Sequence, residues 1–336
     1  MKKTIIALAV LGATAGVAHA QSNVTVYGIV DTGYVKETGS KVTMDEKVNN
    51  RLGFRGVEDL GGGMKATFEL EHRFKLPTGK SSSRGDFEGA ANVGLAGNFG
   101  AVRFGRVNEL STETLRTLDP FNQYGVGGMI ETPLRGHDTE GRLSYTARYD
   151  SPNMSGFSFG ASYSLKNNPN TVGLVTAGGG EGTFDNDGYA LSVKYMNGPI
   201  VALANYNRAV NSNDSYNWNV GGAYSFGPAK LSLAYEKTEL QTAPIVGEDV
   251  GIKNILAGLS YKIGSGTINA SFNRAKADVA GADGTAKKFA LGYTHDLSKR
   301  TSVYLDVART KLDSDYIDFE GNDKINAVNV GVTHKF

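Results

Sequence analysis

The chain has 336 residues, a formal net charge of +1 at pH 7 and no cysteine, and it contains 44 glycines and 16 tyrosines beside one tryptophan. The near-neutral charge gives no reason to propose a nucleic-acid partner, and the lack of cysteine excludes stabilisation by disulfide bonds. Beyond the amino terminus, no stretch approaches the roughly eighteen consecutive apolar residues of a transmembrane helix.

The first twenty residues form a segment of their own. Two lysines precede an apolar run over residues 5–17, and Ala18, His19 and Ala20 match the A-x-A pattern of a cleavage site. This order predicts a secretory signal peptide over residues 1–20, to be excluded from the analysis of the fold. A membrane anchor is disfavoured because the run is too short and two glycines interrupt it.

The rest of the chain is dominated by residues that alternate with a period of two. From Phe157 to Leu165, apolar residues at odd positions alternate with serine and glycine at even positions. Such alternation indicates β-strands that have one apolar face and one polar face. Sixteen segments are expected to be strands: 24–36, 50–58, 64–74, 87–97, 101–107, 141–149, 156–166, 187–196, 200–210, 216–226, 229–238, 251–263, 267–277, 285–295, 301–310 and 324–336.

The lengths and connections of these segments predict their architecture. Most have nine or more residues, which is enough to cross a bilayer when the strand is tilted. Tight turns such as 59–63 and 97–100 alternate with longer polar connections such as 171–187. We therefore expect residues 21–336 to form an all-β, 16-stranded antiparallel transmembrane β-barrel, with short periplasmic turns and long extracellular loops. A barrel of this size encloses an aqueous channel.

A soluble sandwich or barrel is the alternative for any alternating chain. It would bury the apolar face and expose the polar one. Sixteen long, regularly spaced strands behind a signal peptide disfavour it. The end of the chain points the same way, because apolar residues alternate from Val328 onwards and the chain stops on Phe336.

One stretch interrupts the alternation for more than thirty residues, between Val107 and Gly141. A connection of this length is usually functional or disordered. Here packing residues, among them Pro120 and Phe121, are mixed with charged ones, which favours a folded insert. Its candidate acidic residues are Glu109, Glu113, Asp119 and Glu131.

Several segments resemble the trimeric general porins of Gram-negative bacteria, most closely their β-proteobacterial branch. They are VTVYG from Val24, RLGFRGVEDLGGGMKATFELE from Arg51, VGLAGNFGAVRFGR from Val93, ARYDSP from Ala147, ALGYTHDLSKRTSVY from Ala290, and the terminal Phe336. The resemblance covers the whole chain after the signal peptide. It implies an outer-membrane channel for passive diffusion of small hydrophilic solutes and ions.

The same resemblance implies how the chain is assembled. It suggests a homotrimer in contact with outer-membrane lipid and lipopolysaccharide, and recognition by the barrel-assembly machinery through Phe336. It also implies that the third extracellular loop, residues 108–140, folds into the lumen and constricts the pore.

Strand parity predicts which charged residues line that pore. If Leu52, Phe54, Val102, Phe104, Leu143, Tyr145 and Tyr149 face lipid, then the basic residues that face the lumen are Arg51, Arg55, Arg103, Arg142 and Arg148. Asp31, Glu69 and Glu71 also point inward. Arginines on the wall opposite carboxylates on the loop would set up a transverse field in a narrow passage.

The resemblance adds a detail about selectivity. Arg51 and Arg142 fall where general porins keep wall arginines, whereas Gly89 and Ala90 stand where a third arginine is common. Glu88 precedes them. This departure weakens any prediction of strong anion selectivity.

Enzymatic function is disfavoured by context. The G-x-S-x-G pattern from Gly156 to Gly160 needs a strand–turn–helix setting, but it lies inside an alternating strand. No histidine pair has metal-ligand spacing, so we expect neither catalysis nor a cofactor. The alternatives are a substrate-specific channel of the same build, an outer-membrane barrel enzyme and a surface adhesin.

Overall fold

The computed structural model describes residues 23–82, 85–131, 141–166, 186–210, 214–240, 249–279, 282–313 and 322–336. The predicted signal peptide, residues 1–20, lies outside the described residues. The last part of the predicted pore loop, residues 132–140, lies outside them as well.

Sixteen long strands, two short strands and one helix, α2, occur in the described part of the chain. The long strands are β1 (Asn23–Glu37), β3 (Arg51–Gly61), β4 (Met64–Lys75), β6 (Ala90–Gly97), β7 (Gly100–Asn108), β8 (Arg142–Asp150), β9 (Phe157–Ser164), β10 (Gly188–Asn197), β11 (Ile200–Arg208), β12 (Tyr216–Phe226), β13 (Ala229–Leu240), β14 (Val250–Ile263), β15 (Gly266–Val279), β16 (Ala282–Asp296), β17 (Thr301–Leu312) and β18 (Lys324–Lys335). The short strands are β2 (Thr43–Asp45) and β5 (Lys80–Ser81), and α2 spans Leu110–Leu118.

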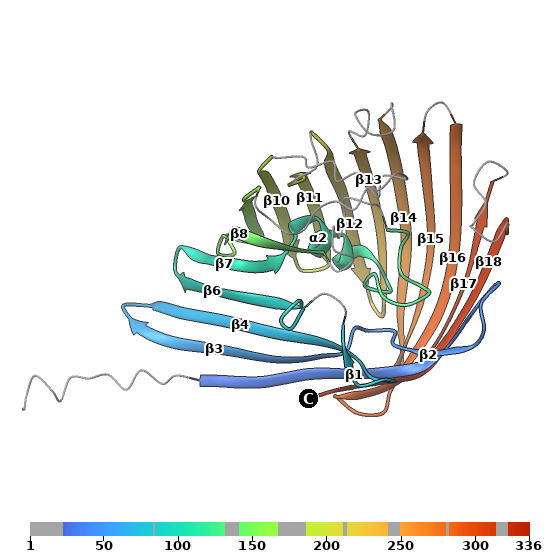
Figure 1. The fold of residues 1–336 in the computed structure, drawn as a ribbon, viewed down its shortest axis with the longest axis horizontal. Helices are drawn as coiled ribbons and strands as arrows, with labels where there is room; N and C mark the ends of the chain where they lie inside the picture. Colours follow the sequence, from blue (N-terminus) through green and yellow to red (C-terminus); the bar gives the residue numbers. More distant parts are fainter. Residues whose placement is uncertain are drawn as a thin grey trace, which may run out of the picture.

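Each long strand pairs antiparallel with the next long strand along the chain, and the last pairs with the first. The closing ladder between β1 and β18 begins at Ile29↔Lys335 and ends at Glu37↔Ala327. Beyond it, Gly28 and Phe336 exchange two backbone hydrogen bonds, of 3.0 and 3.1 Å. The predicted 16-stranded antiparallel barrel is therefore confirmed (Figure 1).

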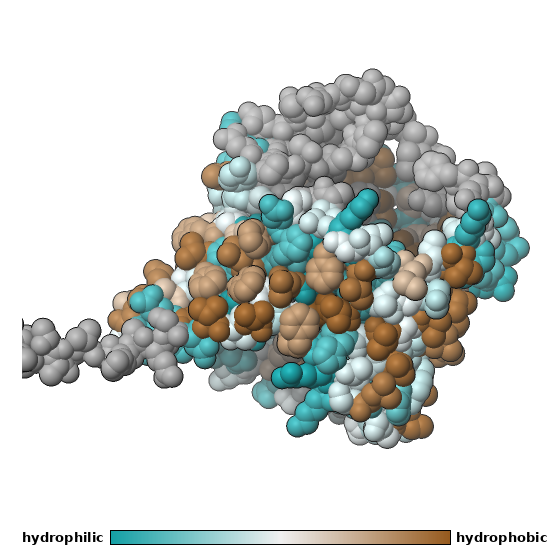
Figure 2. All heavy atoms as spheres, turned by 60° about the horizontal axis from the view of Figure 1, so that its bottom comes forward, coloured by the Kyte–Doolittle hydropathy of each residue, from teal (hydrophilic) through white to brown (hydrophobic). Residues whose placement is uncertain are grey.

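Side chains alternate between the two faces of this wall. On β13, Leu231 and Leu233 are exposed on the outside, whereas Ser232 and Ala234 are buried on the inside. The same holds for most strands, and Figure 2 shows apolar residues spread over the outer surface. An apolar exterior is what a hydrocarbon layer requires, since lipid offers no hydrogen-bond partners.

Strand β8 departs from simple alternation. Its register against β7 shifts between Gly105 and Val107, and Tyr145 has a positive φ of 49°. Tyr145 and Tyr149 are exposed, as parity predicts, but Leu143 is only 5% exposed. The prediction that Leu143 faces lipid is therefore wrong, because a β-bulge changes the direction of side chains beyond it.

The loop that follows β7 begins with α2, which the sequence did not predict. Leu110, Leu115 and Leu118 are all buried, so one face of this short helix is apolar. The helix ends before Pro120, because a residue that precedes proline avoids the α conformation and Asp119 is extended. No helix in the described residues has the length and apolar character needed to cross a membrane.

Helix α2 lies on the concave side of the sheet, against β9 to β13 (Figure 1). Leu115, Leu118 and Met129 of the loop pack on Leu203 and Leu256 of the inner wall. Further along, Phe121 and Val126 pack on three wall alanines of β16, β17 and β18. The loop is thus folded into the lumen, as expected.

Four glycines of the inner wall make room for the loop, and we call them the glycine track. A Cβ added to each would lie within 3 Å of a loop side chain: Gly160 against Leu110 at 2.8 Å, Gly221 against Leu118 at 2.5 Å, Gly258 against Pro120 at 2.6 Å and Gly292 against Phe121 at 2.7 Å. Glycine permits this close approach because it has no side chain.

Polar groups of the wall hold the backbone of the loop. Lys230 donates to the carbonyl of Thr117 at 2.8 Å, and Lys288 donates to that of Gly128 at 2.6 Å. The side-chain amide of Asn254 donates to the carbonyl of Ile130 at 2.7 Å. The backbone N–H of Ile130 donates to Asn273 Oδ1, also at 2.7 Å. These contacts satisfy backbone groups that would otherwise be buried without partners.

We expect Gly258→Ala to disturb the seating of the loop, because the new Cβ would meet the rigid ring of Pro120. Overpacking of this kind costs about 1–3 kcal/mol. The free energy of unfolding should fall by that order, and the single-channel conductance should change. Pro120→Ala removes the ring atoms, whereas Ser232 Oγ, 2.5 Å from the added Cβ, remains, so the double variant should recover only the part of both effects that Pro120 causes. A double variant as perturbed as Gly258→Ala alone would show that crowding of Pro120 is not the cause.

Candidate functional site

Three arginines of the inner wall surround one carboxylate, and we call them the wall arginine cluster: Arg51 of β3, Arg73 of β4 and Arg142 of β8. Arg73 binds Glu71 Oε1 through Nε at 2.8 Å and Nη2 at 2.7 Å. Arg51 and Arg142 approach the same carboxylate at 3.8 and 3.9 Å. Tyr27 donates hydrogen bonds to Glu71 at 3.0 Å and to Glu69 at 2.8 Å.

The loop adds an aromatic ring and a fourth cation to this region. Arg51 Nη2 donates to the hydroxyl of Tyr124 at 3.4 Å. The guanidinium of Arg116, on α2, lies 5.2 Å from the centre of the Tyr124 ring. Burial raises the pKa of Tyr124, but the charges of Arg116 and Arg51 outweigh burial and lower it. Among the described residues, Arg51, Arg73 and Arg142 thus lie around Glu71, while Tyr27 connects Glu69 to this group and Tyr124 connects Arg116 to it.

Arg73 was missed by the sequence analysis, and it occupies the place where a third arginine was thought to be absent. A Cβ built on Gly89 would lie 2.7 Å from Arg73 Nε. The carbonyl of Gly89 accepts a hydrogen bond from Arg142 Nε. The positive charge near Gly89 thus comes from β4, one strand away. Parity offered a signal, because Glu69 and Glu71 were predicted to point inward and Arg73 lies two residues further along the same strand.

A second group of charges anchors the loop near the start of α2. Glu113 accepts from Arg148 at 2.6 Å and from Asn108 at 2.8 Å, and Lys194 lies 3.8 Å away. Asp150 pairs with Arg148 at 2.7 Å and also with Arg103. Arg103 and Arg148 face inward as predicted by parity, but each is paired with a carboxylate.

Two of the four candidate loop acids are buried rather than directed at the pore. Glu109 is 1% exposed and accepts hydrogen bonds from Asn207 at 2.5 Å and Thr112 at 3.1 Å. Asp119 is 3% exposed and accepts three backbone N–H groups within the loop, from Phe121, Gln123 and Met129, at 3.0, 2.8 and 2.9 Å. The expected acidic wall is therefore not formed by these two residues.

The remaining candidates differ in position. Glu131 is exposed at the end of the described part of the loop. Arg55 is exposed on β3, with its guanidinium 5.2 Å from the centre of the Tyr27 ring, and lies four residues from Arg51. Among the described residues, no group of three His, Cys, Asp or Glu side chains could hold a metal ion.

The tip of the loop lies beside another buried polar group. Asp31, fully buried on β1, accepts from the backbone N–H of Lys47 at 2.6 Å and from the hydroxyl of Tyr304 at 2.9 Å. The ammonium of Lys47 pairs with Asp306 at 2.7 Å. A Cβ on Gly125 of the loop would lie 3.0 Å from Lys47 Cγ. The segment between β2 and β3 is thereby fixed to the inner wall next to the loop tip.

A closed barrel with an apolar exterior, a polar interior and a loop seated across its lumen is a membrane channel of the porin type. The profile of the Gram-negative porin family matches residues 7–315, and the chain belongs to this family. It is an outer-membrane channel for passive diffusion of small hydrophilic solutes and ions.

Individual relatives agree with this assignment. Outer membrane porin protein 32 of Delftia acidovorans is 35% identical, over 93% of this chain and 90% of that protein. The structure of an anion-selective porin from Comamonas acidovorans is 28% identical, covers 94% of this chain and all of that one, and has a TM-score of 0.79. OmpT of Vibrio cholerae, solved in a trimer form, has the same fold at 16% identity and a TM-score of 0.69. The match covers 94% of this chain and 99% of that one.

The anchoring of the loop by Glu113 should persist well into acid. Burial raises the pKa of this carboxyl, but the charge of Arg148, its hydrogen bond and the charge of Lys194 together lower it to about 2. A group with a lowered pKa stabilises the fold above its unfolded-state pKa, and this stabilisation is lost as the pH falls through the folded value. It should therefore be complete at pH 7 and disappear between about pH 4.5 and pH 2.

Comparison of Glu113→Gln with the wild type tests this expectation. The variant should unfold with a free energy lower by about 1–3 kcal/mol at neutral pH, since it loses hydrogen bonds to a charged group. The difference should remain constant down to pH 5 and shrink below it. Glu131→Gln, which changes an exposed acid of the same loop, should have a smaller effect. A difference independent of pH down to pH 2 would contradict the assignment.

Proposed function

We propose that residues 108–140 constrict the pore and that the wall arginine cluster, with Arg116 and Tyr124, makes this constriction favour anions. The observation that carries the proposal is that three arginines of the inner wall, Arg51, Arg73 and Arg142, converge on one carboxylate, Glu71. Two loop acids that were expected to oppose the arginines, Glu109 and Asp119, are engaged in fastening the loop.

Burial strengthens the effect of these charges. Arg73 and Arg142 are 2% and 5% exposed, so mobile ions screen them less than they would screen charges on a surface. A small anion that passes the constriction is attracted by these charges, whereas a cation is repelled. Guanidinium groups keep their charge at all physiological pH values, so the preference should not depend on pH near neutrality.

Arg55, Arg103 and Arg148 have lesser roles in this proposal. Arg103 and Arg148 share Asp150, and Arg148 also binds Glu113, so their charges are largely compensated. Arg55 lies on the same face as Arg51 and adds positive charge outside the cluster. The description of the Comamonas relative as anion-selective supports an anion preference for this chain.

We further propose a homotrimer in the outer membrane, surrounded by lipid and lipopolysaccharide. The trimer form of OmpT, which has the same fold, supports this assembly. Phe336, partly exposed at the end of the wall, is the candidate signal for the barrel-assembly machinery. The chain acts as a passive channel and is not proposed to be an enzyme.

Replacement of the wall arginines should shift ion selectivity. We expect Arg73→Gln, and more strongly the triple variant with Arg51→Gln and Arg142→Gln, to move the zero-current potential in a KCl gradient toward that of a cation-selective pore. Arg55→Gln removes one charge from the same face of β3 outside the cluster and should shift the potential less. If Arg55→Gln acted as strongly as Arg73→Gln, selectivity would reflect total lumenal charge rather than this cluster.

The number of pores in each inserted unit should be three. At low protein concentration in a planar bilayer, conductance should rise in large steps that close in three equal sublevels. Native mass spectrometry of the detergent-solubilised protein should give three times the chain mass. Single, indivisible conductance levels and a monomeric mass would contradict the trimer, while leaving the channel function intact.

A further inference from the structure

Seven cations of the described strands stand in two rows that cross the wall from strand to strand, and we call them the cation rows. In the first row, the residues directly opposite each other on β15 to β18 are Arg274↔Lys287, Lys287↔Lys311 and Lys311↔Lys324. In the second row, on β13 to β15, they are Lys237↔Lys253 and Lys253↔Lys276. Because neighbouring strands lie about 4.8 Å apart, the first row spans about 14 Å.

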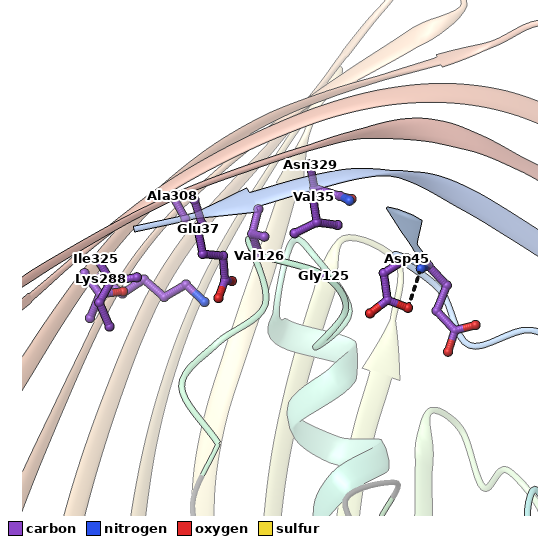
Figure 3. A pocket seen from close by; sticks show the side chains of 12 residues that line it. Val35, Glu37, Asp45, Gly125, Val126, Lys288, Ala308, Ile325 and Asn329 are labelled. Atoms are coloured by element: carbon purple, nitrogen blue, oxygen red, sulfur yellow. Dashed lines mark hydrogen bonds between the residues drawn. The ribbon is translucent and has the colours of Figure 1, made fainter. Parts of the chain in front are cut away.

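The cation rows face outward. Lys288 and Ile325 line a cavity on the inner side of the wall, beside the tip of the loop (Figure 3). Lys287 and Lys324 are their neighbours in sequence, and both are exposed. Since successive side chains of a strand point to opposite faces, Lys287 and Lys324 lie on the outside of the barrel. The other members lie on that face as well, because residues directly opposite each other on paired strands share a face.

Most of the charge in these rows is not neutralised by the protein. Like charges directly opposite each other destabilise a sheet. At the ends of the rows, Lys237 pairs with Glu239 at 2.7 Å and Lys324 pairs with Asp323 at 2.9 Å. Four members form no ion pair within the part of the chain that the structure describes: Lys253, Arg274, Lys287 and Lys311. The outer wall therefore keeps a repulsive arrangement that an external anion would relieve.

The rows lie near one end of the barrel. They are close to the strand ends that lead to the long connections 241–249 and 313–323. Further along the same outer face, Ile255, Phe289 and Leu305 are exposed. A cation on the lipid face costs little near the membrane interface and much more at the centre of the bilayer. The cation rows are therefore placed at the level of lipid headgroups, beside an apolar band at the level of acyl chains.

This combination selects the chemistry of a ligand. Phosphate groups accept strong, charge-assisted hydrogen bonds from lysine and arginine. One phosphate reaches two neighbouring cations and leaves the rest of a row of about 14 Å unmatched. A free polyphosphate would match the row and leave the apolar band without a contact. A lipid whose headgroup carries several phosphates matches both.

We propose that the cation rows bind an outer-leaflet lipid whose headgroup carries two or more phosphates. Arg274, Lys287 and Lys311 donate hydrogen bonds to the phosphates, while the acyl chains pack on Phe289 and Leu291. The inference names a lipid partner for the proposed channel and rests on its place in the outer membrane. It does not rest on the anion preference, because the wall arginine cluster lies on the opposite face of the wall.

Native mass spectrometry of the folded protein in detergent tests the proposal with three lipids: lipid A with two phosphates, lipid A with one phosphate, and phosphatidylethanolamine. The first should bind saturably and more tightly than the second, because it engages more of the row. Phosphatidylethanolamine, which has no net charge, should bind weakest. The preference for two phosphates should decrease as the salt concentration rises, since exposed charges are screened by salt.

The double variant Lys287→Gln, Lys311→Gln should weaken binding of the two-phosphate lipid A about tenfold, because two charge-assisted contacts are lost. Its matched control is Lys299→Gln, Arg300→Gln. This control removes two exposed cations from the turn that joins the same strands, β16 and β17, at their other end, and should leave binding unchanged. In detergent without lipid, the first variant should be no less stable than the wild type, because it relieves repulsion between like charges.

Three results would overturn the proposal. The first is the absence of saturable binding of the two-phosphate lipid A to the wild type. The second is an equal loss of binding in both double variants, which would indicate attraction by net charge. The third is full competition by inorganic tripolyphosphate at the same concentration, which would indicate a phosphate site that needs no lipid. The zero-current potential is measured in a phosphatidylcholine bilayer without lipid A, so either proposal can fail while the other stands.

Discussion

Every backbone N–H and C=O group inside a hydrocarbon layer must find its partner within the protein, and the ladder between β1 and β18 is what meets this requirement here. Because the sheet closes on itself, each strand has one face toward lipid and one toward the lumen. Along β13, Leu231 faces the lipid and the next residue, Ser232, faces the lumen. The buried charged and amide side chains of the described strands, such as Asp31, Glu71 and Asn207, are thereby placed on the inner face.

The inner face has to carry the loop as well as the pore. Seating the loop needs room, which the glycine track gives, and it needs fixed charges. Glu109 and Glu113 bind groups of the wall, and Asp119 ties the loop to itself. Carboxylates used in this way are withdrawn from the aqueous passage, whereas the three arginines of the wall arginine cluster converge on one carboxylate, Glu71. The anion preference proposed above is thus partly a consequence of how the loop is fastened.

The architecture could be predicted from the sequence because it rests on local periodicity. A period of two and the spacing of turns are visible in a window of ten residues, and they gave sixteen strands and the location of the long loop. The inward direction of Arg51 and Arg148 follows from the same rule. The bulge in β8 could not be predicted in this way. Tyr145 has a φ of 49°, a conformation that tyrosine rarely adopts, and no pattern in the sequence indicates it.

The partners of the loop acids could not be predicted, for a physical reason. Glu109 meets Asn207, 98 residues away, and Thr114 meets Asn219, 105 residues away. These contacts depend on where a folded loop comes to rest, and no periodicity encodes that position. An exposed carboxylate and a buried one have the same appearance in a sequence, although their electrostatic consequences are opposite.

Arg73 and Gly89 show how the charge of a pore can be independent of any one sequence position. The backbone N–H of Gly89 donates to the carbonyl of Glu71, so side chains near these two points of neighbouring strands reach into one volume. A Cβ on Gly89 would already lie 2.7 Å from Arg73 Nε. A long side chain at position 89 and the present orientation of Arg73 therefore exclude each other. In this chain the guanidinium nearest to Gly89 is that of Arg73, from the neighbouring strand β4. A sequence motif that considers only position 89 would therefore miss this positive charge, although Arg73 places a guanidinium in the same volume.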